Sequence, residues 1–203
     1  NMKRMMRGGV LVRRMVGIET AGNLNVLFTD KTGTLTTGKL SVISVVTPRD
    51  SFSSVREVRN APPIASMLAM DGAFCKGNGR GNATDRAMGV FSTTGSSRQR
   101  PVAKLPFESK NRMSAACIDT DDGLITIVRG APETILGKCI SYLDHDGGET
   151  SISSFARADL ISEWNKRTSE CCRVIVSAYC RGNRISQIEH GDMPELILTG
   201  MIV

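Results

Sequence analysis

Hydrophobic and polar positions along the chain predict a mixture of strands and helices. Short apolar runs predict strands, and apolar residues at helical spacing predict helices. The expected strands cover residues 24–28, 41–47, 102–105, 113–119, 124–128, 174–179 and 196–203. The expected helices cover residues 13–20, 54–71 with an interruption at two prolines, 83–91, 131–139 and 155–171. A turn at residues 120–123 predicts that the strands on either side of it form a hairpin.

The end of the chain and its composition limit what kind of protein this is. The last apolar segment reaches Val203 without a turn or cap, so we expect a fragment of a longer protein. A content of 40% hydrophobic and 23% charged residues is typical of a globular protein with a buried core. No apolar run approaches the roughly 20 residues that a membrane helix needs. We therefore expect the fragment itself to be soluble.

Charge and cysteine content argue against two classes of function. Basic residues near the N-terminus account for five of the six net positive charges: Lys3, Arg4, Arg7, Arg13 and Arg14. With only 4% aromatic residues, the rest of the chain offers few platforms for base stacking, so we expect no nucleic-acid partner. The six cysteines form no CxxC pair and only two histidines accompany them, which favours reduced thiols over a zinc site or a disulfide scaffold.

Candidate chemistry lies in the polar loop that follows the expected strand at residues 24–28. Asp30 stands at the end of that strand, and Lys31 and a run of Thr and Gly follow it. A carboxylate in this position can act as a nucleophile toward phosphorus. Lys31, the hydroxyl groups and the backbone N–H groups can hold phosphate oxygens. A capped turn is the alternative reading of the three residues Asp-Lys-Thr alone.

The complete string Asp30-Lys31-Thr32-Gly33-Thr34-Leu35-Thr36 resembles the DKTGTLT signature of P-type ATPases, which are ion pumps phosphorylated on aspartate. The resemblance implies that Asp30 accepts the γ-phosphoryl group of ATP, with Lys31, Thr32 and Thr34 beside it in the catalytic loop. It also implies Mg²⁺ as a cofactor, held by the Asp30 side chain and the backbone carbonyl of Thr32. The basic N-terminus then resembles a segment that leaves a membrane helix on its cytoplasmic side.

Two further segments resemble the nucleotide-binding motifs of the same family. Residues 81–85, Gly-Asn-Ala-Thr-Asp, resemble the acidic segment near the adenine, with Asp85 where many relatives carry Glu. Residues 106–114 resemble the segment whose Phe stacks on adenine, which implies this role for Phe107. A basic residue of this loop approaches the nucleotide in the family. Because the loop is one residue shorter here, either Lys110 or Arg112 can take that part.

Two more motifs complete the set of implied ATP contacts. Arg129-Gly130-Ala131-Pro132-Glu133 resembles the KGAPE motif, with Arg in place of Lys. Gly130 and Ala131 would let the backbone approach the adenosine, and Arg129 would supply positive charge. Arg173 stands where the family often has an arginine that reaches the phosphates of ATP.

The resemblance implies a fold of mixed α/β and α+β type. Residues 1–40 and a return strand at 197–203 would belong to a partial Rossmann-like, haloacid dehalogenase-like phosphorylation domain. Residues 41–196 would form an inserted nucleotide-binding domain, an antiparallel sheet flanked by helices. The implied protein is a P-type cation pump in a membrane, of which this chain would be a cytoplasmic part. We expect the fragment to bind ATP without turnover.

Other functions and the identity of the ion stay open. The chain could be a nucleotide-binding regulatory module in which Asp30 is not phosphorylated. It could also be a soluble haloacid dehalogenase-like phosphatase, although Thr32 stands where such enzymes carry the Asp that transfers protons. The motifs resemble those of the calcium, magnesium and proton branches of the family more than those of heavy-metal pumps. Calcium is the preferred cation.

Overall fold

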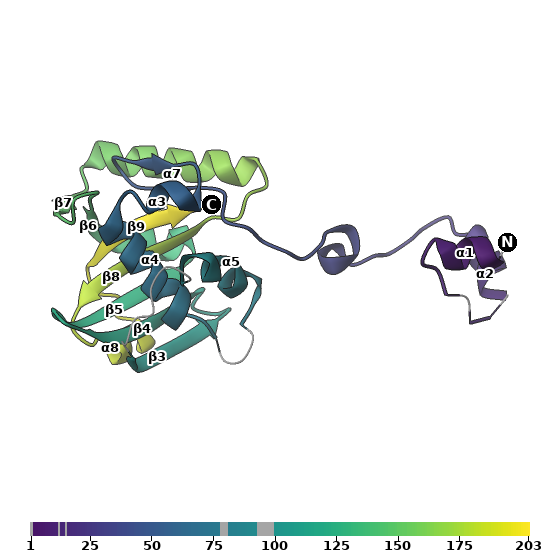
Figure 1. Cartoon of the computed structure of the whole chain (residues 1–203), viewed down its shortest axis with the longest axis horizontal. Coiled ribbons are helices and arrows are strands. Elements are labelled where there is room, and N and C mark those ends of the chain that lie inside the picture. The colour runs from purple at the N-terminus through teal and green to yellow at the C-terminus, as the bar shows by residue number, and fades with distance from the viewer. Residues whose placement is uncertain (1, 12, 15, 78–80, 93–99) are drawn as a thin grey trace. The chain divides into compact units, whose positions relative to one another are not determined.

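The computed structural model describes residues 2–11, 13–14, 16–77, 81–92 and 100–203. It divides after Gly38 into two compact units, residues 1–38 and residues 39–203, and each is described here by itself (Figure 1). Within the described ranges, every helix is too short or too polar to cross a membrane.

The larger unit is built on a mostly antiparallel sheet. Its strands follow the order β2-β1-β9-β8-β5-β4-β3, and β6 pairs in parallel with β9 and antiparallel with β7. The strand bounds are β1 Val45–Val46, β2 Ser51–Phe52, β3 Pro101–Glu108, β4 Met113–Thr120, β5 Gly123–Gly130, β6 Cys139–Leu143, β7 Glu149–Ser151, β8 Ile175–Arg181 and β9 Leu196–Ile202. The predicted antiparallel sheet is confirmed, and so is the hairpin, in which Thr120 pairs with Gly123.

Helices cover both faces of this sheet (Figure 1). One face packs against α3 (Val55–Val58), α4 (Pro62–Phe74) and α5 (Ala83–Ser92). The opposite face packs against α6 (Pro132–Ile135), the short helix η2 (Leu136–Lys138), α7 (Ser154–Ser169) and α8 (Ile185–Glu189). The sheet is therefore the middle of three layers.

Alternation along the strands explains the two buried cores. Neighbouring residues of a strand point to opposite faces, so a central strand must be apolar on both. On β5, Ile127 packs into the core beneath α4 and α5, whereas Val128 packs into the core beneath α7. The single tryptophan of the chain, Trp164 on α7, packs against the second of these cores.

The structure corrects one predicted helix of this unit and adds elements that were not predicted. The helix expected at 131–139 consists only of α6 and η2, because Cys139 already begins β6. The short strands β2 and β7 and the helix α8 were not predicted. Residues 197–203 form most of β9, which pairs with β1, β6 and β8. Their assignment to a phosphorylation domain stays a prediction.

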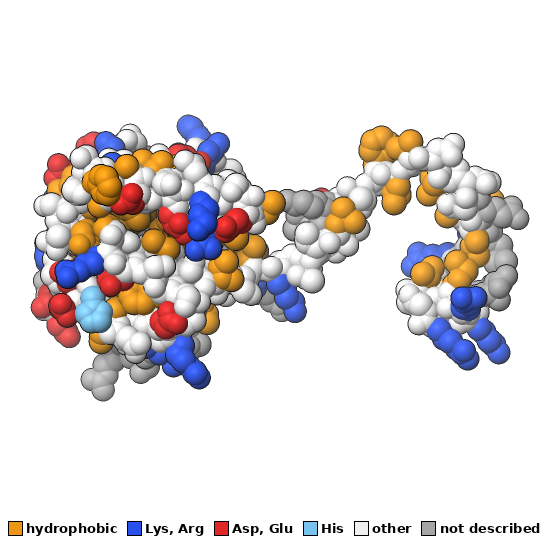
Figure 2. Space-filling view, turned by 90° about the horizontal axis from the view of Figure 1, so that it is seen from above, with side chains coloured by type: hydrophobic (Ala, Val, Ile, Leu, Met, Phe, Trp, Pro, Cys, Tyr) orange, Lys and Arg blue, Asp and Glu red, His pale blue; other side chains and the backbone are white. Residues whose placement is uncertain are grey.

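The smaller unit contains helices but no sheet among its described residues. Its elements are α1 (Met2–Arg7), α2 (Val16–Gly22) and a short π-helix, η1 (Lys31–Leu35). Figure 2 shows basic side chains gathered in the N-terminal part of the chain, whereas both signs of charge mix over the larger unit. The buried strand predicted at 24–28 is wrong: these residues are extended but exposed, and Phe28 is 95% exposed. A strand needs a partner for its N–H and C=O groups, and no described residue up to Gly38 supplies one.

Candidate functional site

A pocket of about 520 Å³ opens beside the N-terminal end of α5, the turn between β3 and β4, and the segment that enters β8. Its volume is within the range typical of small-molecule sites. It is lined by Asn82, Ala83, Thr84, Phe107, Arg112, Ser114, Arg129, Gly130, Ala131, Arg173, Val174 and Ile175. The fold thus brings together six of the predicted nucleotide-binding residues from three separate segments.

Asp85, in the first turn of α5, stabilises the wall of this pocket by hydrogen bonding to Asn82. Asn82 caps the helix: its Oδ1 accepts the backbone N–H of Asp85 at 2.9 Å, and Asp85 Oδ2 accepts the N–H of Asn82 at 2.9 Å. This reciprocal pair is a capping box, formed here by Asn and Asp. Gly81 precedes it at φ +64°, where an added Cβ would lie 2.7 Å from the Cβ of Asp85. Asp85 is therefore buried and does not line the pocket.

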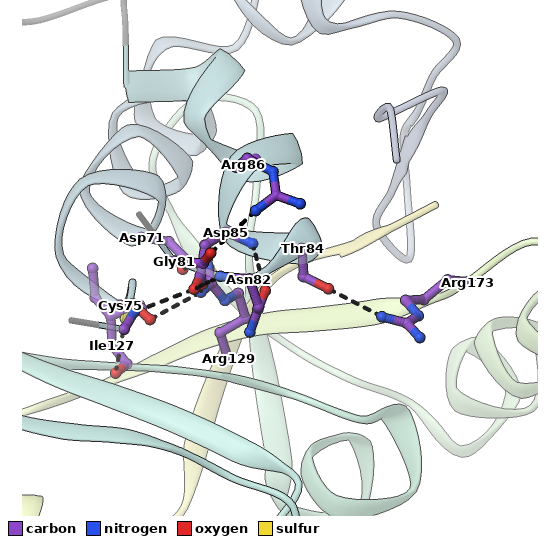
Figure 3. Close-up of polar contacts among 11 residues, drawn as sticks. Asp71, Cys75, Gly81, Asn82, Thr84, Asp85, Arg86, Ile127, Arg129 and Arg173 are labelled. Atoms are coloured by element: carbon purple, nitrogen blue, oxygen red, sulfur yellow. Dashed lines mark hydrogen bonds and ion pairs between the residues drawn. The ribbon is translucent and has the colours of Figure 1, made fainter. Parts of the chain in front are cut away.

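Arg129 joins Asp85 in a buried ionic cluster (Figure 3). Its Nη2 donates to Asp85 Oδ1 and, at 2.9 Å, to the backbone carbonyl of Cys75. Its Nη1 lies 3.2 Å from Oδ1 of Asp71, a fully buried residue of α4. Only 4% of Arg129 is exposed, so its guanidinium is directed into the protein rather than offered to a ligand.

The cluster contains two carboxylates and one guanidinium in a water-poor setting. Burial raises the pKa of Asp71 above its ordinary value, and the attraction of Arg129 offsets only part of that effect. Burial by itself lowers the pKa of Arg129, but the surrounding groups, Asp71 first, shift it upward overall. Arg129 therefore keeps its charge, and Asp71 is the group whose protonation the site perturbs.

Gly130 is required by a close approach within the protein. A Cβ at this position would lie 2.5 Å from the carbonyl oxygen of Arg112 and 2.7 Å from the Cβ of Met113. Arg112 itself has φ +52°, in the left-handed region, and its carbonyl accepts the N–H of Ala131 at 3.0 Å. The glycine lets the β3–β4 turn pack on the end of β5, so one wall of the pocket is closed by the protein's own backbone.

The outer part of the pocket carries its accessible aromatic and basic groups. Phe107, near the end of β3, is 46% exposed. Arg112 forms an exposed ion pair with Glu133 at 2.6 Å. Arg173 donates from Nη1 to Oγ1 of Thr84, at the N-terminal end of α5, at 3.3 Å (Figure 3). Of the two basic residues left open by the sequence, the described part of the pocket includes Arg112 but not Lys110, which is exposed on the same turn.

The residues of the predicted phosphorylation loop belong to the smaller unit. Asp30 and Thr34 are exposed, and Lys31 and Thr32 lie in η1, although their side chains are outside the described part of the chain. Asp30 and the carbonyl of Thr32 are oxygen donors of the kind that Mg²⁺ prefers. Among the described residues, however, His, Cys, Asp and Glu form no group of three that could hold a metal ion. A magnesium site at Asp30 and the carbonyl of Thr32 stays a prediction.

Two members of the site were not predicted. Asp71 is a single carboxylate inside the otherwise apolar helix α4, and that isolation was the signal that could have drawn attention to it. Thr84 was read only as part of the acidic segment, yet it bonds Arg173 from 89 positions away. Pairings over such distances in sequence are invisible to a local pattern.

Comparison with known proteins identifies the family. Residues 64–202 match the family model described as P-type ATPase, cytoplasmic domain N. This match covers well over half of the chain, including the sheet and the pocket. The chain belongs to the P-type ATPase family.

Individual P-type ATPases resemble it over most of its length. A probable cation-transporting ATPase I of Mycobacterium tuberculosis is 30% identical over 176 residues, covering 78% of this chain and 11% of that protein. Calcium-transporting ATPase 8, plasma membrane-type, of Arabidopsis thaliana is 25% identical, covering 88% of the chain and 18% of the relative. Calcium-transporting ATPase 1 of Yarrowia lipolytica is 28% identical, covering 98% and 25%. The chain thus spans between about a tenth and a quarter of these P-type ATPases.

Proposed function

We propose that the larger unit is the nucleotide-binding part of a P-type cation pump and that it binds ATP in the pocket beside α5. The observation that carries this proposal is the convergence of Phe107, Arg112, Arg129 and Arg173 on one pocket. The family membership supports it, because the matched region is the cytoplasmic domain N. The domain assignment then becomes residues 39–203 for the nucleotide-binding part, with β9 included.

The pocket favours a particular division of labour among its residues. Phe107 offers an exposed ring for the adenine to stack on, in the manner of aromatic pairs. Arg112 and Arg173, both exposed, offer guanidinium groups that can meet phosphate oxygens in a bidentate manner. Arg129 is committed to Asp71 and Asp85, so in our proposal it shapes the wall rather than contacting phosphate. Lys110 stays a peripheral candidate.

The test is a calorimetric titration of the 203-residue chain with ATP. Phe107→Ala should weaken ATP binding by about 5-fold to 150-fold, since base–aromatic stacking is worth about 1–3 kcal/mol. Phe155→Ala is the matched control, because Phe155 is an exposed phenylalanine on α7, away from the pocket lining. Equal affinities of the two variants, or no binding by the parent at millimolar ATP, would overturn the assignment.

For the complete pump we propose that ATP phosphorylates Asp30. A carboxylate oxygen of Asp30 forms a bond to the γ-phosphorus while the bond to the bridging oxygen of ADP breaks, and ADP leaves. The string of residues 30–36 and the family membership support this step. Acid-stable incorporation of label from γ-labelled ATP into the full-length protein, lost in Asp30→Asn, tests it. Label that persists in Asp30→Asn would overturn it.

The cargo of the pump is proposed to be a cation, with calcium preferred. Two of the relatives reported above are calcium-transporting ATPases by name, and the mycobacterial one is a cation-transporting ATPase. Ion-stimulated phosphorylation of the full-length protein tests the preference. Stimulation by another cation and not by Ca²⁺ would contradict it.

A further inference from the structure

Asp71 is a buried carboxylate that the pocket does not use directly. It is fully buried on α4 and is not among the residues that line the pocket. Neither of its carboxylate oxygens has an aligned hydrogen-bond partner among the described residues. Its charge is balanced by Arg129, whose Nη1 lies 3.2 Å from its Oδ1. Removing Arg129 would leave this buried carboxylate unpaired, and an unpaired buried charge strongly lowers the stability of a fold.

The backbone fixes Asp71 rigidly behind the pocket. The next residue, Gly72, is at a close crossing of two helices: an added Cβ would lie 2.5 Å from the carbonyl oxygen of Met88 in α5. Asp85 is in the first turn of that same α5. The crossing therefore holds Asp71 and Asp85 at a fixed separation, with the guanidinium of Arg129 between them.

Arginine fits this arrangement better than lysine does. The planar guanidinium meets Asp71 through Nη1 and Asp85 through Nη2, and it also donates to the carbonyl of Cys75. A lysine carries one compact ammonium group, which cannot reproduce this fork. With lysine at this position, one of the two buried carboxylates would lose its partner.

We propose that Asp71 is a positioning residue of the pocket: with Asp85 it locks the guanidinium of Arg129 into the pocket wall and makes arginine necessary there. Asp71 acts through Arg129 and does not touch the nucleotide. The inference rests on the proposed function in one respect, namely that the ligand of the pocket is ATP.

A mutant cycle on the 203-residue chain tests this proposal, which we call the lock: Asp71 and Asp85 hold the guanidinium of Arg129 in the pocket wall. Arg129→Lys, Asp71→Asn and the double variant are compared with the parent for ATP affinity and for the urea midpoint. We expect Arg129→Lys to weaken ATP binding about tenfold or more, and Asp71→Asn about threefold. The double variant should bind ATP more tightly than Arg129→Lys, because removing the charge of Asp71 removes the carboxylate that lysine leaves unpaired. A double variant no better than Arg129→Lys would overturn the proposal.

Thr126→Val is the control for a general loss of stability. Thr126 is buried on the same strand as Arg129 but points to the other face, where its hydroxyl donates to the carbonyl of Gly182 at 2.7 Å. The Thr126→Val variant should lower the urea midpoint and leave ATP affinity unchanged. If Arg129→Lys does not fold, Asp71→Asn decides: weaker binding than that of Thr126→Val supports the lock, and the parent's affinity overturns it.

The two proposals fail in different ways. If the parent binds no ATP, the assignment of the ligand is wrong, and the urea midpoints alone decide the lock. A double variant more stable than Arg129→Lys then supports it. Additive losses of stability overturn it.

Discussion

The two units of this chain carry sequence motifs of similar clarity but differ in how far the fold organises them. In residues 39–203, side chains predicted from three motifs converge on one pocket, whose wall is fixed by a capping box and a buried ionic cluster. In residues 1–38, most of the predicted phosphorylation motif lies in a short helix, whose described side chains are exposed and which follows exposed apolar residues. A motif indicates the kind of chemistry, but packing against neighbouring elements is needed to orient its side chains.

The hydrophobic residues of the two units show the same contrast. Ile127 on β5 is fully buried because β4 and β8 flank its strand and helices cover both faces. Leu27 has a similar apolar neighbourhood in sequence, yet it is 72% exposed. Burial thus follows from strand partners rather than from local pattern.

The largest effect is expected when the same negative charge is introduced into each of the two units. Ile127→Asp should cost more than about 4 kcal/mol of unfolding free energy, because it buries an unpaired carboxylate between the sheet and α4. Leu27→Asp should change it by less than about 0.5 kcal/mol. Urea unfolding followed by circular dichroism measures both. A large loss in Leu27→Asp would show that residues 24–28 are packed in the folded chain.

A second test concerns the close approach at Gly130. Gly130→Ala should destabilise the larger unit by about 2–3 kcal/mol and weaken ATP binding, because the added Cβ meets the backbone of Arg112. Gly137→Ala is the matched control, since nothing lies within 4 Å of its Cβ. Thermal unfolding and calorimetry of both variants measure the effects. Equal stability of the two would contradict the packing described for the β3–β4 turn.

A third test uses the raised pKa of Asp71, which Arg129, Cys75 and Asp85 face. The folded state binds this proton more tightly than the unfolded state does, so Asp71 makes stability fall as pH rises from its ordinary pKa of 3.8 to its folded pKa. Asp71→Asn should lose this part of the pH dependence, measured by urea unfolding between pH 4 and pH 7. Parallel pH profiles for parent and variant would contradict the assignment.

The smallest effect is expected from removing residues 1–38. Both buried cores of the larger unit are formed by residues beyond this segment. The truncated protein should keep its unfolding free energy within about 0.5 kcal/mol and its ATP affinity within twofold. Urea unfolding and calorimetry provide the comparison. A tenfold loss of affinity would show that the N-terminal segment contributes to the nucleotide site.

The sequence was most informative where hydrophobic alternation is long and the turn is explicit. β4, β5 and their hairpin follow from the largely apolar segments 113–119 and 124–128 on either side of Asp121-Asp122. Only Cys139, the first residue of β6, was included in the helix predicted at 131–139, and the rest of β6 was not predicted. Strands of two or three residues, such as β2 and β7, exist through pairing and leave almost no local signal.

The pocket was predictable in membership but not in the roles of its residues. Motif order located Phe107, Arg129 and Arg173 on one site. It could not show that Arg129 is turned inward, because Asp71 is 58 positions away along the chain. The acidic partner becomes visible only when α4 and β5 are packed together.

The position of Trp164 has a practical consequence for spectroscopy. The only indole of the chain packs on the α7 side of the sheet, whereas the pocket opens on the side of α5. Its emission should follow unfolding of the larger unit and stay silent when a nucleotide enters. The protein therefore carries a native spectator fluorophore, and an optical reporter of ATP has to be placed on the other side of the sheet.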